Sequence, residues 1–120
     1  MKGKQYLTRS EDFDRVYRQK AAWASRLLVL RAAENKADFT RYGYSISKRV
    51  GNAVVRNLTR RRLRAIMRRT GLKPGWDIVL IVRPAAAQAH FSELNQAVEG
   101  LLRRAKLLDQ KNEISCLNTD

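Results

Sequence analysis

The sequence predicts a single α+β domain in which helices pack on one sheet of about four strands. Two observations carry this prediction. Apolar residues recur at helical spacing in three segments, and between those segments lie short runs that are rich in β-branched residues or alternate in polarity. A chain of 120 residues, 44% of them hydrophobic, has room for one such core. We expect residues 1–120 to form one domain, with an ordered core over about 5–108 and a polar tail over 109–120.

The first predicted element is a short helix that begins near Ser10. Serine is a good N-cap, and two acidic residues follow it in the first turn, where negative charge suits the helix dipole. Phe13, Val16 and Tyr17 then lie at helical spacing and form one apolar and aromatic stripe.

Strands are predicted next, over Arg26–Ala33 and Phe39–Ser47, with Glu34–Asp38 as a hairpin turn between them. A further strand within Ala21–Ser25 stays open. The second run alternates, with Tyr42, Tyr44 and Ile46 on one face and Arg41, Gly43, Ser45 and Ser47 on the other.

A long helix is expected over Ala53–Arg69, because Gly51 and Asn52 interrupt the chain before it and Thr70-Gly71 stops it. Asp77–Arg83 contains a continuous apolar, β-branched run, which is typical of a buried central strand. The last helix is expected over Phe91–Leu108. The predicted order is therefore helix, two or three strands, helix, strand, helix.

Positive charge is concentrated in one window of the sequence. The formal net charge is +14, and no acidic residue lies between Asp38 and Asp77. Outside that window 14 basic and 11 acidic residues nearly cancel, as the totals of 25 and 11 require. A local excess of this size predicts a docking surface for a polyanion. The window holds Arg41, Lys48, Arg49, Arg56, Arg60, Arg61, Arg62, Arg64, Arg68, Arg69 and Lys73.

The long helix is predicted to carry most of this charge on one face. Like charges four residues apart destabilise a helix, and no glutamate relieves them here. Guanidinium groups pair bidentately with phosphate, so the face suits a nucleic acid. A helical wheel places Arg56, Arg60, Arg64 and Arg68 in one row with Asn57 and Arg61 beside it, and an apolar half with Val54, Val55, Leu58, Leu63 and Ile66 opposite.

The remaining residue types argue against a protein-based active site. His90 is the single histidine and is expected at a helix start, while Cys116 is the single cysteine and lies in the predicted tail. Carboxylates do not cluster as a two-metal nuclease requires. The longest apolar run has five residues, so we expect neither a membrane span nor a signal peptide, and a cytoplasmic location. The sequence does not decide whether Trp23 and Trp76 lie in the core or face RNA.

Residues 43–57, Gly-Tyr-Ser-Ile-Ser-Lys-Arg-Val-Gly-Asn-Ala-Val-Val-Arg-Asn, followed by closely spaced arginines, resemble the signature of the bacterial ribonuclease P protein subunit. The similarity extends over about residues 5–108. It implies an α/β sandwich similar to the second domain of a small-subunit ribosomal protein, with a left-handed β-α-β crossover. It also implies a protein that assists a catalytic RNA, with Mg²⁺ bound mainly by that RNA, in removing the 5′ leader of precursor tRNA.

The resemblance assigns roles to particular residues. Those that would bind the RNA subunit are Lys48, Arg49, Asn52, Arg56, Asn57, Arg60, Arg61, Arg64 and Arg68. Those that would bind the precursor-tRNA leader are Phe13, Tyr17, Ser45 and Ser47. No catalytic residue and no metal ligand is expected in the chain. The partners implied are ribonuclease P RNA and precursor tRNA, without a membrane, DNA or an obligate protein partner.

Some alternatives remain at this point. The family's Arg-Asn-Arg run ends here in Leu58, which the helical wheel places in the apolar half, where it would pack. Taken alone, the residues favour core packing for Phe13 and Tyr17, whereas the resemblance favours a leader contact. A ribosomal or RNA-chaperone protein of similar basic fold is the main alternative function, and a DNA-binding helix is a weaker one.

Overall fold

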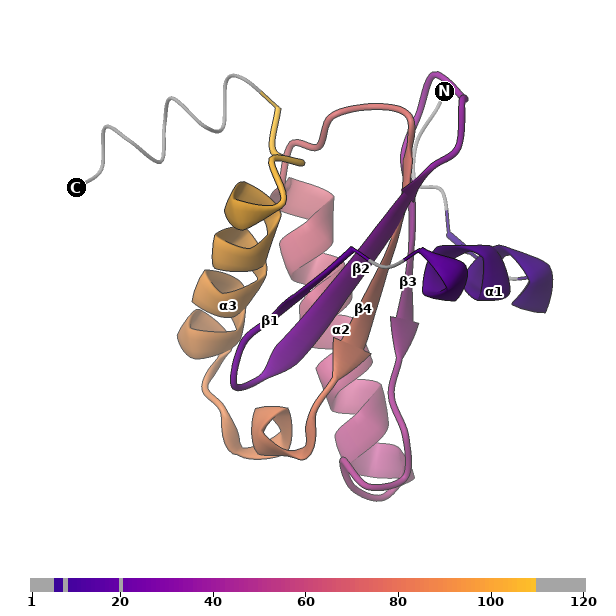
Figure 1. The fold of residues 1–120 in the computed structure, drawn as a ribbon. Coiled ribbons are helices and arrows are strands. Elements are labelled where there is room, and N and C mark those ends of the chain that lie inside the picture. The colour runs from indigo at the N-terminus through magenta and orange to yellow at the C-terminus, as the bar shows by residue number, and fades with distance from the viewer. Residues whose placement is uncertain (1–5, 8, 20, 110–120) are drawn as a thin grey trace, which may run out of the picture.

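A four-stranded sheet with helices on both faces organises the protein (Figure 1). The structure is a computed structural model that describes residues 6–7, 9–19 and 21–109. The elements in chain order are α1 (Ser10–Arg18), β1 (Ala22–Ala24), β2 (Leu28–Glu34), β3 (Arg41–Ser45), α2 (Ala53–Arg69), β4 (Trp76–Val82), the 3₁₀ helix η1 (Pro84–Gln88) and α3 (Phe91–Arg104). The predicted fold class is confirmed, and the strand left open within residues 21–25 is β1.

The strand order is β1-β2-β4-β3, which corrects the predicted hairpin between the second and third strands. β2 pairs antiparallel with β4, and β3 pairs parallel with β4. The connection at residues 35–40 therefore passes the start of β4 instead of folding β2 back onto β3. The apolar run of β4 has the expected central place, because it needs a strand on each side to satisfy its backbone.

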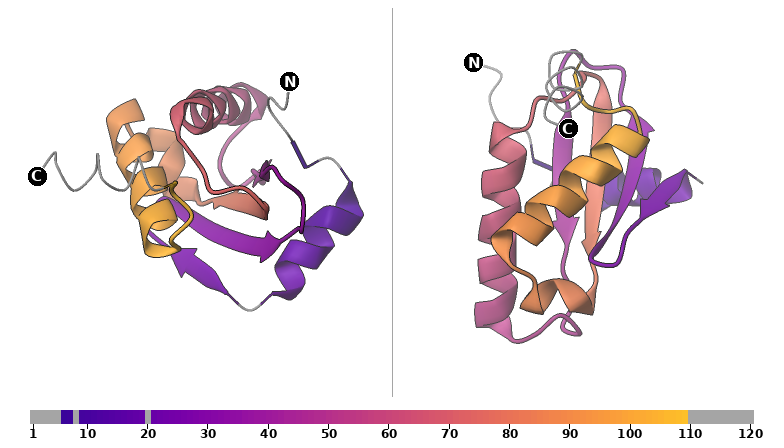
Figure 2. Two further views of the ribbon diagram at one scale, coloured as in Figure 1. Left: turned by 90° about the horizontal axis from the view of Figure 1, so that it is seen from above. Right: turned by 90° about the vertical axis from the view of Figure 1, so that its left-hand side faces the viewer.

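The β3-α2-β4 unit is a left-handed crossover. In Figure 1 both strands run downward, β3 lies to the right of β4, and α2 lies behind the sheet. The views in Figure 2 agree in placing α2 and α1 on opposite faces. This is the unusual hand that the family resemblance implied and that the general rule for such crossovers opposes.

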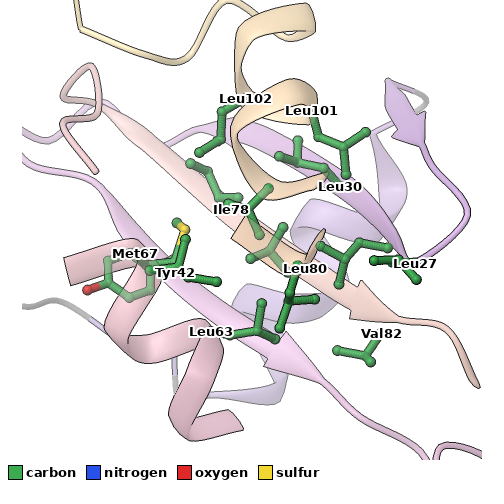
Figure 3. Close-up of a cluster of buried hydrophobic side chains, with 14 of the residues drawn as sticks. Leu27, Leu30, Tyr42, Leu63, Met67, Ile78, Leu80, Val82, Leu101 and Leu102 are labelled. Carbon is green, nitrogen blue, oxygen red and sulfur yellow. The ribbon is translucent and has the colours of Figure 1, made fainter. Parts of the chain in front are cut away.

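Two apolar clusters hold the layers together. The larger one lies between the sheet and the helices α2 and α3, and its buried members include Leu30, Leu63, Ile78 and Leu101 (Figure 3). The smaller one lies under α1 on the other face, where Leu7, Val16, Ala33 and Val79 are buried. Trp23 and Trp76 pack against the larger cluster, so both serve the core.

Several helix ends differ from the prediction. Ser10 is the first residue of α1 and not its cap; Arg9 holds the cap position without a side-chain hydrogen bond. The end of α2 at Arg69 is as predicted. α3 ends at Arg104 and not at Leu108, because Lys106 adopts a left-handed backbone conformation that turns the chain. Leu108 is buried all the same, through a bridge to Leu72.

His90 occupies the cap position of α3, as predicted, and its backbone N–H donates to Glu93 Oε1 at 2.8 Å. Cys116 and the predicted tail from residue 110 onward lie outside the described residues. No helix of the described part is long and apolar enough to cross a membrane.

Candidate nucleic-acid interface

The basic surface consists of the turn after β3 and the outward side of α2. Lys48 and Arg49 are exposed in that turn, which closes through a hydrogen bond from Val50 N to Ser47 O at 3.1 Å. Asn52 caps α2, since its side chain accepts from Val55 N at 3.0 Å. Asn52 is exposed, and its side-chain carbonyl group already holds the end of the helix.

The predicted arginine row is present, but it runs obliquely along α2. Arg56, Arg60 and Arg64 are half-buried, and Arg68 is exposed. Arg60 donates to Asn57 Oδ1 at 2.7 Å, which ties its guanidinium group to the helix surface. The row is therefore one edge of the basic surface. The exposed centre of that surface lies beside the row on α2.

Val54 and Leu58 occupy that exposed centre together with Arg61, which corrects part of the predicted apolar half. Its other members are confirmed, because Leu63 and Ile66 are buried and Val55 packs against the core. Val54 is 74% exposed and Leu58 is 43% exposed, so neither packs in the core. Thr59 is buried in their place, and its hydroxyl donates to Val55 O at 2.9 Å. Leu58 thus stands at the surface where the family's third motif residue is an arginine.

No arginine of α2 forms an ion pair with a carboxylate of the described residues. Arg64 instead lies over the ring of Tyr6, with its guanidinium carbon 5.7 Å from the ring centre. Arg62 donates to the Ala89 carbonyl at 3.1 Å and so faces α3. Within the described residues, the positive charge of this surface is therefore not neutralised by a carboxylate.

Arg41, by contrast, does not belong to the basic surface, although it lies in the basic window of the sequence. Its guanidinium group pairs with Asp77 and Asp12 beneath α1. The hydrogen bonds to Asp77 chiefly raise the pKa of Arg41, and burial opposes them. Its charge is neutralised within the fold.

A pocket of about 330 Å³ lies between α1 and β3, on the opposite face of the sheet from α2. Three of the four predicted leader residues line it, namely Phe13, Tyr17 and Ser45. The two rings are tilted against each other at 6.4 Å between their centres. Ser47 does not line it, because it lies beyond the end of β3, where its hydroxyl accepts from Arg49 N at 3.3 Å.

Tyr44 connects the pocket with the basic surface, and sequence reasoning missed this. It also lines the pocket, while its hydroxyl group is buried without a hydrogen-bond partner among the described residues. Burial raises the pKa of Tyr44 and, to a smaller extent, that of Tyr42. β3 is an edge strand of the sheet, so the pocket on one face and the arginine row on the other lie near the same edge, where Leu7 N donates to Tyr42 O at 3.0 Å.

The fold and this surface define a class: a small basic α+β protein whose cationic face suits a polyanionic partner. The family model described as Ribonuclease P matches residues 1–106. The chain belongs to the ribonuclease P protein family, which places it in tRNA processing and implies association with ribonuclease P RNA.

Individual relatives agree along nearly the whole chain. The ribonuclease P protein component of Dehalococcoides mccartyi strain 195 is 40% identical over 120 residues and covers 100% of both chains. That of Roseiflexus castenholzii is 42% identical over 108 residues, with 88% of each chain covered. The structure of the Staphylococcus aureus RNase P protein matches with a TM-score of 0.79 at 30% identity, over 87% of this chain and 97% of that one. The RNase P protein from Thermotoga maritima matches with a TM-score of 0.76 at 25% identity, over 84% and 97%.

Proposed function

We propose that this chain binds the RNA subunit of ribonuclease P through its basic surface and the single-stranded 5′ leader of precursor tRNA through the pocket between α1 and β3. The observation that carries the proposal is the face of α2, whose arginines find no carboxylate among the described residues. Guanidinium groups that are left unneutralised gain most from phosphate.

The pocket suits an unpaired nucleic acid strand. Phe13 and Tyr17 are half-buried, so each ring keeps a free edge or face toward the pocket. Stacking of a base on an aromatic ring contributes about 1–3 kcal/mol and is tolerant of sequence. Such tolerance is what a subunit needs when it accepts the leaders of many different precursors.

The reaction itself is proposed to be Mg²⁺-dependent hydrolysis at the 5′ end of the tRNA, carried out by the RNA. Among the described residues, no three His, Cys, Asp or Glu side chains lie close enough together to hold a metal ion. Asp12 and Asp77 are engaged by arginines and are poor candidates for ligands. In this proposal the chain's own residues bind and orient RNA, and the Mg²⁺ is held mainly by the RNA partner.

Reconstitution tests this proposal. The protein is mixed with a bacterial ribonuclease P RNA and precursor tRNA at low Mg²⁺, and release of the 5′ leader is measured. We expect the protein to stimulate cleavage and to favour precursor over mature tRNA. If RNA binds but cleavage is not stimulated, the chain is a binding module of the ribosomal or RNA-chaperone kind, and the proposal fails.

A further inference from the structure

A cluster of charged residues connects α1 to the sheet. Asp77, at the start of β4, is completely buried. Its carboxylate accepts from Arg41 Nε at 2.9 Å and Nη2 at 2.6 Å, from Asn35 Nδ2 at 2.8 Å, and from Arg15 Nη2. Arg41 also reaches both carboxylate oxygens of Asp12 at 3.4 Å. We call Asp12, Arg15, Asn35, Arg41 and Asp77 the Asp77 cluster.

The cluster attaches one helix to three strands. Asp12 and Arg15 belong to α1, whereas Arg41 lies on β3 and Asp77 on β4. Arg15 donates in addition to the carbonyl of Glu34, the last residue of β2, at 2.9 Å. The charged contacts therefore fix the position of α1 relative to the strand that forms the other wall of the pocket.

Apolar packing holds α1 through one buried side chain and two half-buried rings. Val16 is the single residue of α1 that is buried, and the apolar cluster beneath the helix has few members. At 100° per residue, Asp12 and Arg15 lie on one side of Val16, and Phe13 and Tyr17 lie on the other. The half-buried rings of Phe13 and Tyr17 also pack on the apolar cluster from their side, and the charged contacts hold the opposite side of the helix, so the two sets of contacts together fix its rotation.

We propose that the Asp77 cluster consists of positioning residues for the leader pocket. By fixing the rotation of α1, it holds the rings of Phe13 and Tyr17 in place as one wall of the pocket. This inference rests on the proposed function of the pocket. It assigns no contact between the cluster and RNA.

The charges of the cluster predict how its disruption differs from disruption of the basic surface. Two carboxylates and two guanidinium groups leave it formally neutral. A neutral cluster positions α1 without adding to the phosphate contacts that make RNA binding depend on salt. Its disruption is therefore expected to change selectivity for the leader while the affinity for the RNA subunit, and the salt dependence of that affinity, stay the same.

Arg15→Met is the variant of choice, because Asp77 keeps both bonds from Arg41 and the bond from Asn35, so no buried carboxylate is left unpaired. Arg18→Met is the matched control, since Arg18 is an exposed arginine on the same helix. For each assembled ribonucleoprotein the measured quantity is the ratio of its affinities for precursor and mature tRNA. Arg15→Met should lower that ratio by about fivefold or more, the lower end for removal of one base stack. Arg18→Met should leave the ratio unchanged.

A double-mutant cycle with Phe13→Ala identifies the route of the effect. If the cluster acts by placing the ring, Arg15→Met adds little to the decrease already caused by Phe13→Ala. If the two substitutions lower the precursor-to-mature affinity ratio additively, the inference is overturned. It is also overturned if Arg15→Met leaves the ratio unchanged while Phe13→Ala lowers it. An unchanged ratio for Phe13→Ala itself would remove the leader pocket from the proposed function and this inference with it.

Asp12→Asn gives a second test that keeps the volume of the side chain. It weakens the hold on Arg41 without exposing Asp77, so the fold survives and thermal unfolding can confirm this. The ratio should fall in the same direction as for Arg15→Met, and by less. A parallel decrease in affinity for the RNA subunit, with the ratio unchanged, would show that the cluster supports the fold alone and would refute a positioning role.

Discussion

Gly43 offers a test of how closely α1 packs on the sheet. A methyl group added at Gly43 would lie 2.7 Å from Phe13 Cζ and 3.1 Å from both Phe13 Cε1 and Leu7 Cβ. Carbon atoms prefer about 3.5–4.0 Å, so the ring of Phe13 must move by roughly 0.8 Å or more. In Gly43→Ala the ring that lines the pocket is displaced by a side chain from the strand beneath it.

Two opposing effects set the stability of Gly43→Ala. Overpacking costs about 1–3 kcal/mol, and the removal of glycine's freedom in the unfolded chain returns about 0.4–1 kcal/mol. Gly43 does not need a positive φ, so no backbone strain is added. The steric effect is the larger one, and we expect the free energy of unfolding to fall by roughly 0.5–2 kcal/mol.

Urea denaturation measures this change, and Gly100→Ala is the control. Nothing lies within 4 Å of a methyl group at Gly100 in α3, so that variant should gain about 0.5–1 kcal/mol. Gly43→Ala should also lower the precursor-to-mature affinity ratio, and adding Phe13→Ala should reduce the stability cost of the new methyl group. A Gly43→Ala protein that is as stable as the parent and equally selective would refute the close packing of Phe13 on β3.

Three further predictions concern the basic surface and the strand edge. For the double variant Arg60→Ala, Arg64→Ala, the measured quantity is the slope of log affinity for the RNA subunit against log salt concentration. That slope should become shallower by about 0.7–0.9 for each RNA phosphate that the protein no longer neutralises. An unchanged slope would place the row outside the interface. Leu58→Arg should make the same slope steeper by about that amount for one additional phosphate, since Leu58 is exposed among arginines; a slope equal to the parent's would show that RNA phosphates do not reach this position. Tyr44→Phe removes a buried hydroxyl group that has no partner among the described residues and should raise the free energy of unfolding by about 1 kcal/mol. Burial raises the pKa of Tyr44, so above a pH of about 10 the unfolded tyrosine ionises while the folded one does not, and the parent should lose stability as the pH rises. In urea titrations over that range, Tyr44→Phe should lose less stability than the parent. Equal decreases would contradict the burial of the hydroxyl group.

The limits of α2 could be predicted from the sequence, but the side it buries could be predicted only in part. Local signals set the limits, because Asn52 caps the start and Thr70 ends the helix. The buried side depends on how the helix meets the sheet, and that contact is made by Leu63, Ile66 and Met67 in its second half. Toward the start of the helix, the residue on the same side as Leu63, Ile66 and Met67 is Thr59, four residues before Leu63, and not Leu58. The helical wheel therefore placed Val55, Leu63 and Ile66 correctly but put Val54 and Leu58 on the buried side wrongly.

The strand order and the Asp77 cluster were out of reach for a related reason. Neighbouring strands in a sequence usually pair, and only the positions of residues 76–82 in space show that β4 separates β2 from β3. Arg15 and Asp77 are 62 positions apart and meet because α1 crosses β4. The leader residues, in contrast, followed from the family resemblance, and all but Ser47 line the same cavity, whereas Tyr44 in that cavity was missed.

The central position of β4 has a consequence for how the chain acquires its structure during synthesis. The β1-β2 hairpin can form as soon as residue 34 has left the ribosome, whereas β3 gains its strand partner only with residues 77–81. Until then the nascent protein carries two unsatisfied strand borders and an arginine-rich helix with no sheet to rest on. Assembly of this small protein therefore waits for its final third, and a chain interrupted before that point would expose edges that are prone to aggregate.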